Sequence, residues 1–243
     1  MAERGTRIVK PDILRDLMER MLRAAGCEAQ AAATAADVFL EADLRGIGLQ
    51  GLDHLPTMIR SLRSGRTNGS GRPRIVREGD AFTLIDGGAG PGQVAAILAA
   101  DLAAAKAAKT GVATVGIFNS SDIFMVGFYS ERMARAGRVG FVFSDAPPLV
   151  HAHGGVERAL GTNPLSIAVP TDGDHPLVLD LSTSAWSASR MRAENASMSC
   201  TSRPVRRSST WPITRMSLPA RRPRTTSPWP RPNAMSGWGR ARR

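Results

Sequence analysis

The chain has 243 residues, a formal net charge of +11 and a pI of about 11.2. This length can form one large domain or two small ones, and this charge ordinarily suggests nucleic acid or an anionic surface as a partner. The charge is uneven, because residues 192–243 hold twelve arginines, one glutamate, no lysine and no aspartate. Residues 1–191 are therefore electrically balanced, and we do not expect them to bind nucleic acid.

Targeting and metal signals are lacking in the sequence. The two cysteines, Cys27 and Cys200, form neither a disulfide framework nor a zinc-binding spacing. The first twelve residues are charged and lack the apolar core of a signal peptide. An apolar run of about 18 residues, which a membrane span requires, does not occur. We expect a reduced, cytoplasmic protein with no membrane span and no metal site.

Residues 1–70 are predicted to be a helical segment. An amphipathic pattern begins at Pro11 and ends at Gly26, and a second, alanine-rich pattern ends at Gly46. A shorter stretch that ends at Gly65 is typical of a helix or a turn.

Residues 71–190 are predicted to be an α/β core, because strand and helix patterns alternate there. Two short strands flank Glu78–Asp80 and predict a hairpin. The remaining elements expected are helices at 93–109 and 126–137, and strands at 111–118, 138–145, 165–171 and 177–182.

Two loops in this core have spacings that invite a functional interpretation. The stretch "DGGAGPGQ" at Asp86–Gln93 lies between a strand and a helix, but its glycines do not have the G-x-G-x-x-G spacing. We therefore interpret it as a turn and not as a Rossmann site. "NSSDIFMVGFY" at Asn119–Tyr129 could offer backbone N–H groups to an anion, or Ser121 or Asp122 could simply cap the following helix.

Two later stretches carry turn and hydroxyl residues next to strands. Gly161–Pro164, "GTNP", precedes a strand, and ordinary turn chemistry accounts for it. Asp180–Ser184, "DLSTS", places a carboxylate and three hydroxyls after an apolar strand, and helix capping would explain it equally well.

Taken together, these stretches resemble a known family. "EADLRGIGLQGLDHLP", "VGIFNSSDIFMVGFYSERMARAG", "GGVERALGTNPLSIAVP" and "LVLDLSTS" occur in the order and spacing of the malate/L-lactate dehydrogenase family. The resemblance covers roughly residues 9–190. It implies a non-Rossmann α/β fold with an N-terminal helical part, a mixed-sheet core that binds NAD or NADP, and homodimers.

The resemblance also implies roles for individual residues. Arg45 matches an arginine that can hold a substrate carboxylate through paired N–H bonds. The residues that match cofactor contacts, or belong to the elements that carry them, are Asp180, Leu181, Ser182, Ala146, Gly161, Thr162 and Asn163.

Three positions depart from the family pattern. Gln50 stands where the family has a histidine, and Asp122 stands where it has its acid–base histidine. His54 replaces an arginine that commonly follows the first motif. Carbonyl reduction needs a group that gives a proton at neutral pH, which an ordinary aspartate does poorly. The catalytic candidates are therefore Asp122 with its acidity weakened by burial, or His54, with Gln50 beside them.

Residues 191–243 lose the resemblance and form a segment rich in Arg, Ser and Pro with three of the four tryptophans. This composition is typical of out-of-frame translation of GC-rich DNA. A genuine basic tail or a disordered linker is the alternative.

The sequence thus predicts an NAD(P)-dependent oxidoreductase that acts on a small 2-hydroxy or 2-oxo carboxylate or a related imine. The alternatives are a truncated, inactive member of the same family and a protein that binds nucleic acid through its arginine-rich tail.

Overall fold

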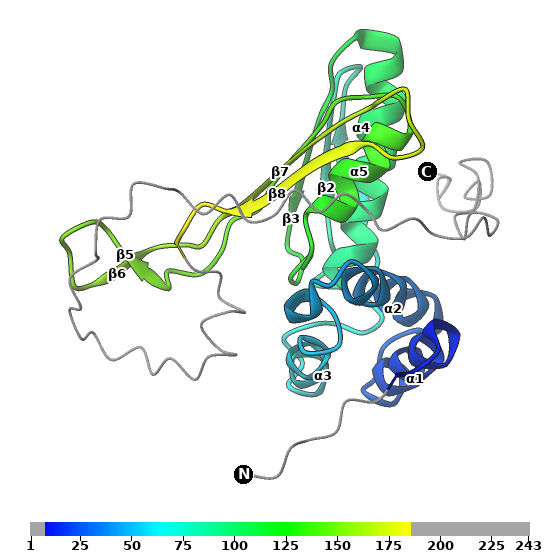
Figure 1. Cartoon of the computed structure of the whole chain (residues 1–243), viewed down its shortest axis with the longest axis vertical. Coiled ribbons are helices and arrows are strands. Elements are labelled where there is room, and N and C mark those ends of the chain that lie inside the picture. The colour runs from blue at the N-terminus through cyan, green and yellow to red at the C-terminus, as the bar shows by residue number, and fades with distance from the viewer. Residues whose placement is uncertain (1–7, 186–243) are drawn as a thin grey trace.

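The structure of the chain, a computed structural model, describes residues 8–185 (Figure 1). Its N-terminal part is helical, as the glycine-punctuated patterns predict. The elements are α1 (Pro11–Ala24), α2 (Ala29–Leu44), the short 3-10 helix η1 (Gly48–Gln50) and α3 (Leu55–Arg63).

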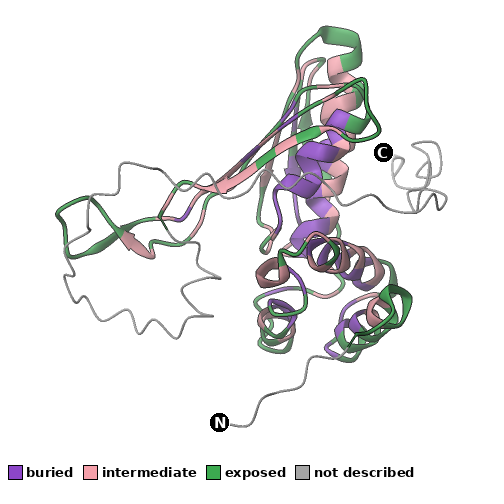
Figure 2. Ribbon diagram, viewed as in Figure 1, coloured by how far each residue is buried: buried purple, intermediate pink, exposed green. Residues whose placement is uncertain are grey.

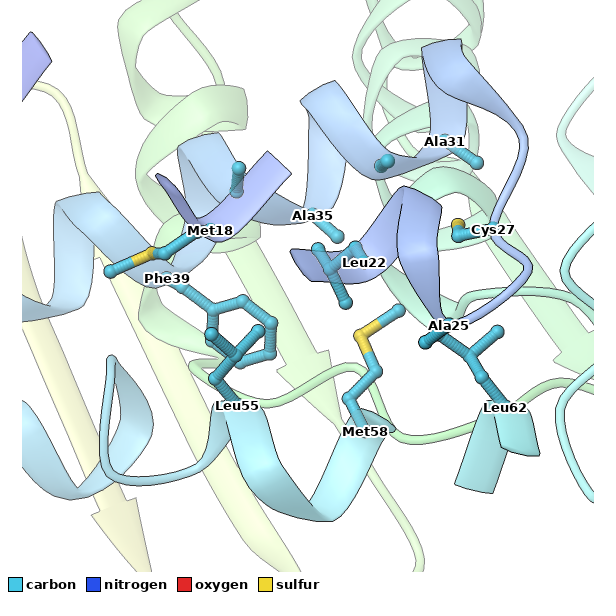
Figure 3. Packing of buried hydrophobic residues seen from close by; sticks show 12 residues of the cluster. Met18, Leu22, Ala25, Cys27, Ala31, Ala35, Phe39, Leu55, Met58 and Leu62 are labelled. Atoms are coloured by element: carbon cyan, nitrogen blue, oxygen red, sulfur yellow. The ribbon is translucent and has the colours of Figure 1, made fainter. Parts of the chain in front are cut away.

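The three α-helices enclose a dense apolar core (Figure 3). Met18 and Leu22 of α1 are completely buried against Phe39 of α2 and Leu55 of α3. Alanines on the inner face of α2 carry little side-chain bulk, so α1 can pack closely against it. The inner faces of the helices are thus buried, while Ile13 and Leu17 on the outer side of α1 remain exposed.

The first sheet follows, with strand order β1-β2-β3. Its strands are β1 (Arg74–Glu78), β2 (Phe82–Asp86) and β3 (Thr114–Phe118), and helix α4 (Gly92–Thr110) connects β2 to β3. The β1–β2 pair is antiparallel and the β2–β3 pair is parallel, so the sheet is mixed. A parallel pair requires such a crossover, and α4 packs against both of its strands.

The second sheet is antiparallel, with strand order β4-β7-β8. Its strands are β4 (Gly140–Phe143), β7 (Pro164–Val169) and β8 (Leu177–Ser182), and helix α5 (Gly127–Arg135) packs on one face. A two-stranded hairpin of β5 (Val150–His151) and β6 (Arg158–Leu160) extends from the end of this sheet (Figure 1).

The expected α/β fold class, with an N-terminal helical segment and mixed-sheet core, is confirmed. The sequence did not predict η1 or the β5–β6 hairpin. The proposed boundaries at residues 70 and 190 stay predictions, and residues 191–243 lie outside the described part.

Residues 8–185 contain no helix long and apolar enough to cross a bilayer. They also contain no group of three His, Cys, Asp or Glu side chains able to hold a metal ion.

Candidate active site

Asp86, at the end of β2, holds the glycine-rich turn in place. Its carboxylate accepts hydrogen bonds from Arg74 Nη2 at 2.8 Å, the Gly88 N–H at 2.9 Å and Asn119 Nδ2 at 2.8 Å. These bonds, that of Arg74 foremost, lower the pKa of Asp86 to about 2. One carboxylate therefore ties the turn to the ends of β1 and β3.

The turn itself is filled by protein backbone. The Ala89 carbonyl accepts the Asn68 N–H at 2.7 Å, and the Ala89 N–H binds the Asn119 carbonyl at 2.7 Å. A side chain on Gly90 would come within 2.4 Å of the Gly71 carbonyl oxygen. The glycines thus allow close backbone packing, which agrees with our interpretation of a turn and leaves no phosphate cradle here.

The segment after β3 caps a different helix from the one predicted. The Ser121 hydroxyl accepts the N–H of Gly92, the first residue of α4, at 3.0 Å. Helix α5 begins only at Gly127, and its N-cap residue, Val126, makes no side-chain capping bond. The prediction that Ser121 or Asp122 caps the following helix is therefore wrong, because the loop folds back onto α4. Asp122 is exposed.

Asp43, near the end of α2, positions the loop that carries Gln50. Its carboxylate accepts the Leu52 N–H at 2.9 Å. A side chain on Gly51 would lie 2.3 Å from Asp43 Oδ1, so glycine is required for this approach. Burial, and to a lesser degree the charge of Asp53, raises the pKa of Asp43.

His54 is buried and contacts the segment after β3. Its Nδ1 lies 3.1 Å from the Leu49 carbonyl oxygen, which places a proton on Nδ1. The imidazole meets the Phe124 ring edge-on at 4.7 Å between centroids, and Phe124 meets Phe39 in the same way at 4.8 Å. Phe124 has a φ of +62°, an uncommon conformation for a bulky residue. This ring therefore connects His54 to the segment that contains Asp122.

Arg45 lies in an ionic cluster between the helical segment and the α/β core. It donates from Nε at 2.9 Å and Nη2 at 2.8 Å to Glu41, and from Nη1 to Glu131 of α5. Glu131 also accepts from Arg135 Nη2 at 2.6 Å. Burial alone would lower the pKa of Arg45, but the two carboxylates outweigh it and raise the pKa. Arg45 thus joins α2 to α5.

Asp180 links the Arg45 cluster to the second sheet. Its carboxylate accepts the N–H of Gly127, the first residue of α5, at 2.8 Å. A side chain on Gly127 would lie 2.6 Å from that oxygen, so glycine permits the contact. Burial raises the pKa of Asp180, and the Gly127 bond and the charge of Arg45 oppose the shift.

The predicted cofactor residues gather at one end of the second sheet. Ala146 follows β4, and its N–H donates to Asn163 Oδ1, just before β7, at 3.0 Å. Ser182, at the end of β8, donates to the Thr162 carbonyl oxygen at 2.8 Å. A side chain on Gly161 would lie 2.3 Å from the Ala146 carbonyl oxygen. With Asp180 and Leu181 on β8, all seven residues therefore occupy adjoining strand ends.

The chemistry of this cluster suits part of a dinucleotide. Ser182 and Ser184 pair their hydroxyls at 2.9 Å, and the Asn163 amide oxygen accepts the Ala146 N–H; such neutral donors and acceptors suit a carboxamide or ribose hydroxyls. The seven predicted residues include no cation, and one of them is Asp180. The diphosphate of a dinucleotide would therefore need positive charge from other residues.

Sequence reasoning missed Asp43 and Glu131, and it assigned the capping hydroxyl of Ser121 to the wrong helix. The spacing of Glu41 and Arg45, four residues apart on a helix, could have indicated their ion pair. Nothing local indicates Glu131 as a partner, because it lies 86 residues from Arg45.

These features define an α/β protein in which Arg45 joins an N-terminal helical segment to a mixed-sheet core, without the Rossmann turn. Residues 9–198 match the model of the family described as malate/L-lactate dehydrogenase. The chain belongs to this family.

Individual relatives agree with this assignment. The chain is similar to a malate dehydrogenase of Pyrococcus abyssi, 40% identical over 182 residues, which are 75% of this chain and 50% of that protein. It is 33% identical over 180 residues to a ureidoglycolate dehydrogenase (NAD(+)) of Escherichia coli O157:H7, covering 73% of this chain and 52% of that protein. The crystal structure of malate dehydrogenase from Entamoeba histolytica superposes with a TM-score of 0.75 and 31% identity, covering 79% of this chain and 54% of that one. The chain spans about half the length of these relatives.

Proposed function

We propose that this protein takes part in NAD(P)-dependent oxidoreduction of a small 2-hydroxy or 2-oxo carboxylate, or of a related cyclic imine. The observation that carries the proposal is the gathering of seven predicted cofactor residues at one end of the second sheet, where one of them, Asp180, also interacts with the charge of Arg45. The family that the chain belongs to supports the same reaction class. We further propose that the working form is a homodimer.

The nicotinamide, when bound, would supply or accept a hydride at the substrate carbon. Asn163, Ser182 and the backbone of Ala146 would hold its neutral parts by hydrogen bonds. The protein's own task is then to hold the substrate carboxylate and to move one proton to or from the substrate oxygen or nitrogen.

Arg45 is our candidate for the residue that binds the substrate carboxylate. A guanidinium has five N–H groups, and the contacts to Glu41 and Glu131 use three of them. One donor therefore remains on each terminal nitrogen, which is the geometry of a bidentate grip. The neighbouring carboxylates fix the side chain but weaken its attraction for an anion.

We favour His54 over Asp122 as the group that transfers the proton to or from the substrate. Imidazole is the side chain that ordinarily changes charge between pH 5 and 8, and its Nδ1 contact to Leu49 orients the ring. Asp122 is exposed, whereas His54 is buried against Phe124. Gln50 does not titrate and can contribute hydrogen bonds only.

The proposal is tested with the full chain by measuring NADH and NADPH binding by fluorescence, and the reduction of 2-oxo acids. Arg45→Lys should raise KM for the 2-oxo acid at least tenfold without changing the Kd of NADH. The matched control is Arg135→Lys, since Arg135 also binds Glu131 but has no proposed substrate contact. His54→Gln should abolish the chemical rate, whereas Asp122→Asn should leave it within about twofold.

An inactive family member is the second candidate, and a specific observation favours it. Gln50 and the exposed Asp122 stand where the family pattern has histidines, so the usual acid–base pair is lost. Binding of NADH without turnover of any 2-oxo acid or cyclic imine would establish this second candidate. Failure to bind either dinucleotide would refute the oxidoreductase proposal.

A further inference from the structure

Two neighbouring residues in the loop between β3 and α5 pack into two different apolar clusters. Ile123 contacts the cluster that α2, α4 and α5 share, whereas Phe124 contacts the cluster enclosed by α1, α2 and α3. The peptide bond between these two residues is therefore held between the α/β core and the helical segment.

Phe124 has a backbone conformation that needs support. Its φ of +62° lies in the left-handed region, which a bulky residue adopts only where the surrounding structure holds it there. This conformation directs the ring to Phe39 and His54, and it meets each of them edge-on. The position of the Phe124 ring, and with it one side of the His54 imidazole, thus depends on the backbone of this loop.

The hydroxyl of Tyr129 fixes that backbone. It donates to the Ile123 carbonyl oxygen at 2.6 Å, in the peptide bond just before Phe124. Tyr129 is only 1% exposed, and its ring meets that of Phe128 edge-on at 5.3 Å between centroids. Burial raises the pKa of Tyr129, so the hydroxyl keeps its proton and remains a donor. A rigidly packed side chain of α5 therefore sets the peptide plane from which φ of Phe124 is measured.

The packing of Tyr129 and its hydrogen bond can be separated. A phenylalanine at position 129 would fill the same apolar cluster, so the hydroxyl contributes the bond to Ile123 rather than the burial of the ring. The imidazole of His54 has one fixed contact on the other side, from Nδ1 to the Leu49 carbonyl oxygen at 3.1 Å. The Phe124 ring supplies a second contact to that imidazole.

We propose that Tyr129 is a positioning residue, whose hydroxyl holds the Ile123–Phe124 peptide so that the Phe124 ring keeps the His54 imidazole in place. The proposal rests on the proposed function only in that His54 is taken to transfer the proton. Proton transfer needs the two reacting atoms within hydrogen-bond reach, so a small displacement of the imidazole slows the chemical step more than it weakens binding.

The test begins with Tyr129→Phe in the full chain, which removes a single oxygen atom. It should lower kcat for a 2-oxo acid at least tenfold, and it should leave KM and the Kd of NADH unchanged. The matched control is Ser130→Ala, which also removes a buried hydroxyl from α5, one that pairs with Ser166 Oγ at 2.6 Å. Ser130→Ala should keep kcat within about twofold, although both variants should lose stability in urea unfolding, since each breaks a buried hydrogen bond.

A double variant tests the route from Tyr129 to His54. Phe124→Leu removes the ring that contacts the imidazole and should lower kcat at least as much as Tyr129→Phe. Adding Tyr129→Phe to Phe124→Leu should then lower kcat no further, because the hydroxyl acts through that ring. Losses that multiply in the double variant would overturn the proposed route.

Nuclear magnetic resonance provides a readout that does not need turnover. With labelled histidine and phenylalanine, the parent should show a nuclear Overhauser contact between the rings of His54 and Phe124, assigned with His54→Gln. Tyr129→Phe should weaken this contact and shift the His54 ring resonances, and Ser130→Ala should do neither. An unchanged His54 signal in Tyr129→Phe, or an equal change in both variants, would overturn the proposal. A parent that binds no dinucleotide refutes the proposed function instead, and the resonance of His54 still decides whether Tyr129 positions it.

Discussion

The helical segment and the second sheet differ in how far they bury their large apolar side chains (Figure 2). Phe39 and Leu22 are completely buried among helices, whereas Phe143 is 71% exposed on the face of the second sheet that α5 does not cover, which we call the open face. The difference is that three helices can enclose their own core, while a three-stranded sheet with one helix can cover only one of its faces.

This difference has a functional consequence. Arg45 and His54 belong to the helical segment, whose core is buried, and the predicted cofactor residues belong to the second sheet, which a helix covers on one face. The site that we propose therefore draws on a part with a buried core and on a sheet with one exposed apolar face. We expect substitutions to separate the two parts by their effects on stability.

The largest effect on stability is expected when a phenylalanine is replaced by alanine, and the size of this effect should differ between the two parts. Phe39→Ala removes a fully buried ring that also packs edge-on against Phe124, and should lower the free energy of unfolding by about 3–5 kcal/mol. Phe141→Ala, on the open face, should cost less than about 1 kcal/mol. Urea unfolding followed by circular dichroism measures both. Equal costs would mean that the open face is buried in the isolated chain.

Much of the fold could be predicted because its elements carry local signals. Gly26, Gly46 and Gly65 all adopt the positive φ that ends a helix, and each ends the pattern where the sequence indicated. The apolar runs of β7 and β8 also predicted strands. The β5–β6 hairpin escaped prediction because its strands have only two and three residues, too few to show a period.

The site was less predictable, because its contacts join distant segments. The hydroxyl of Ser121 had the chemistry of a cap, but no local feature could show that its partner is Gly92, 29 residues earlier. No local feature could likewise show that Glu131 is a partner of Arg45. The resemblance to the family identified the candidate cofactor residues. Only the folded chain shows that the candidates on β8 lie together with those that follow β4 and precede β7.

A smaller effect is expected at the ionic contact that joins the two parts. Arg45→Met leaves Glu41 and Glu131 without this partner, and the Glu131 side chain is only 8% exposed. Because the Arg45 side chain is 24% exposed, we expect a loss of about 2–3 kcal/mol, less than for a fully buried pair. Arg20→Met, which breaks an exposed pair with Asp16, should cost less than about 0.5 kcal/mol. Similar costs in urea unfolding would show that the contact does not join the parts.

The smallest effects concern pH, and two aspartates should show opposite signs. The pKa of Asp86 is lowered from 3.8 to about 2, so its charged form stabilises the fold above pH 4, and this contribution is lost as the pH falls toward 2. The pKa of Asp180 is raised, chiefly by burial, so its charged form is disfavoured in the fold and stability falls as the pH rises above 3.8.

Comparison with the amide variants isolates each group, because other titrating residues cancel in the difference. The stability of the parent relative to Asp86→Asn should increase from pH 2 to pH 4 and then stay level. Relative to Asp180→Asn it should decrease as the pH rises from 4, until Asp180 is fully ionised. Urea midpoints at half-unit pH steps measure both slopes. A falling slope for Asp86 would show that its carboxylate does not hold the glycine-rich turn in place. A rising slope for Asp180 would mean that its bond to Gly127 and its attraction to Arg45 outweigh its burial.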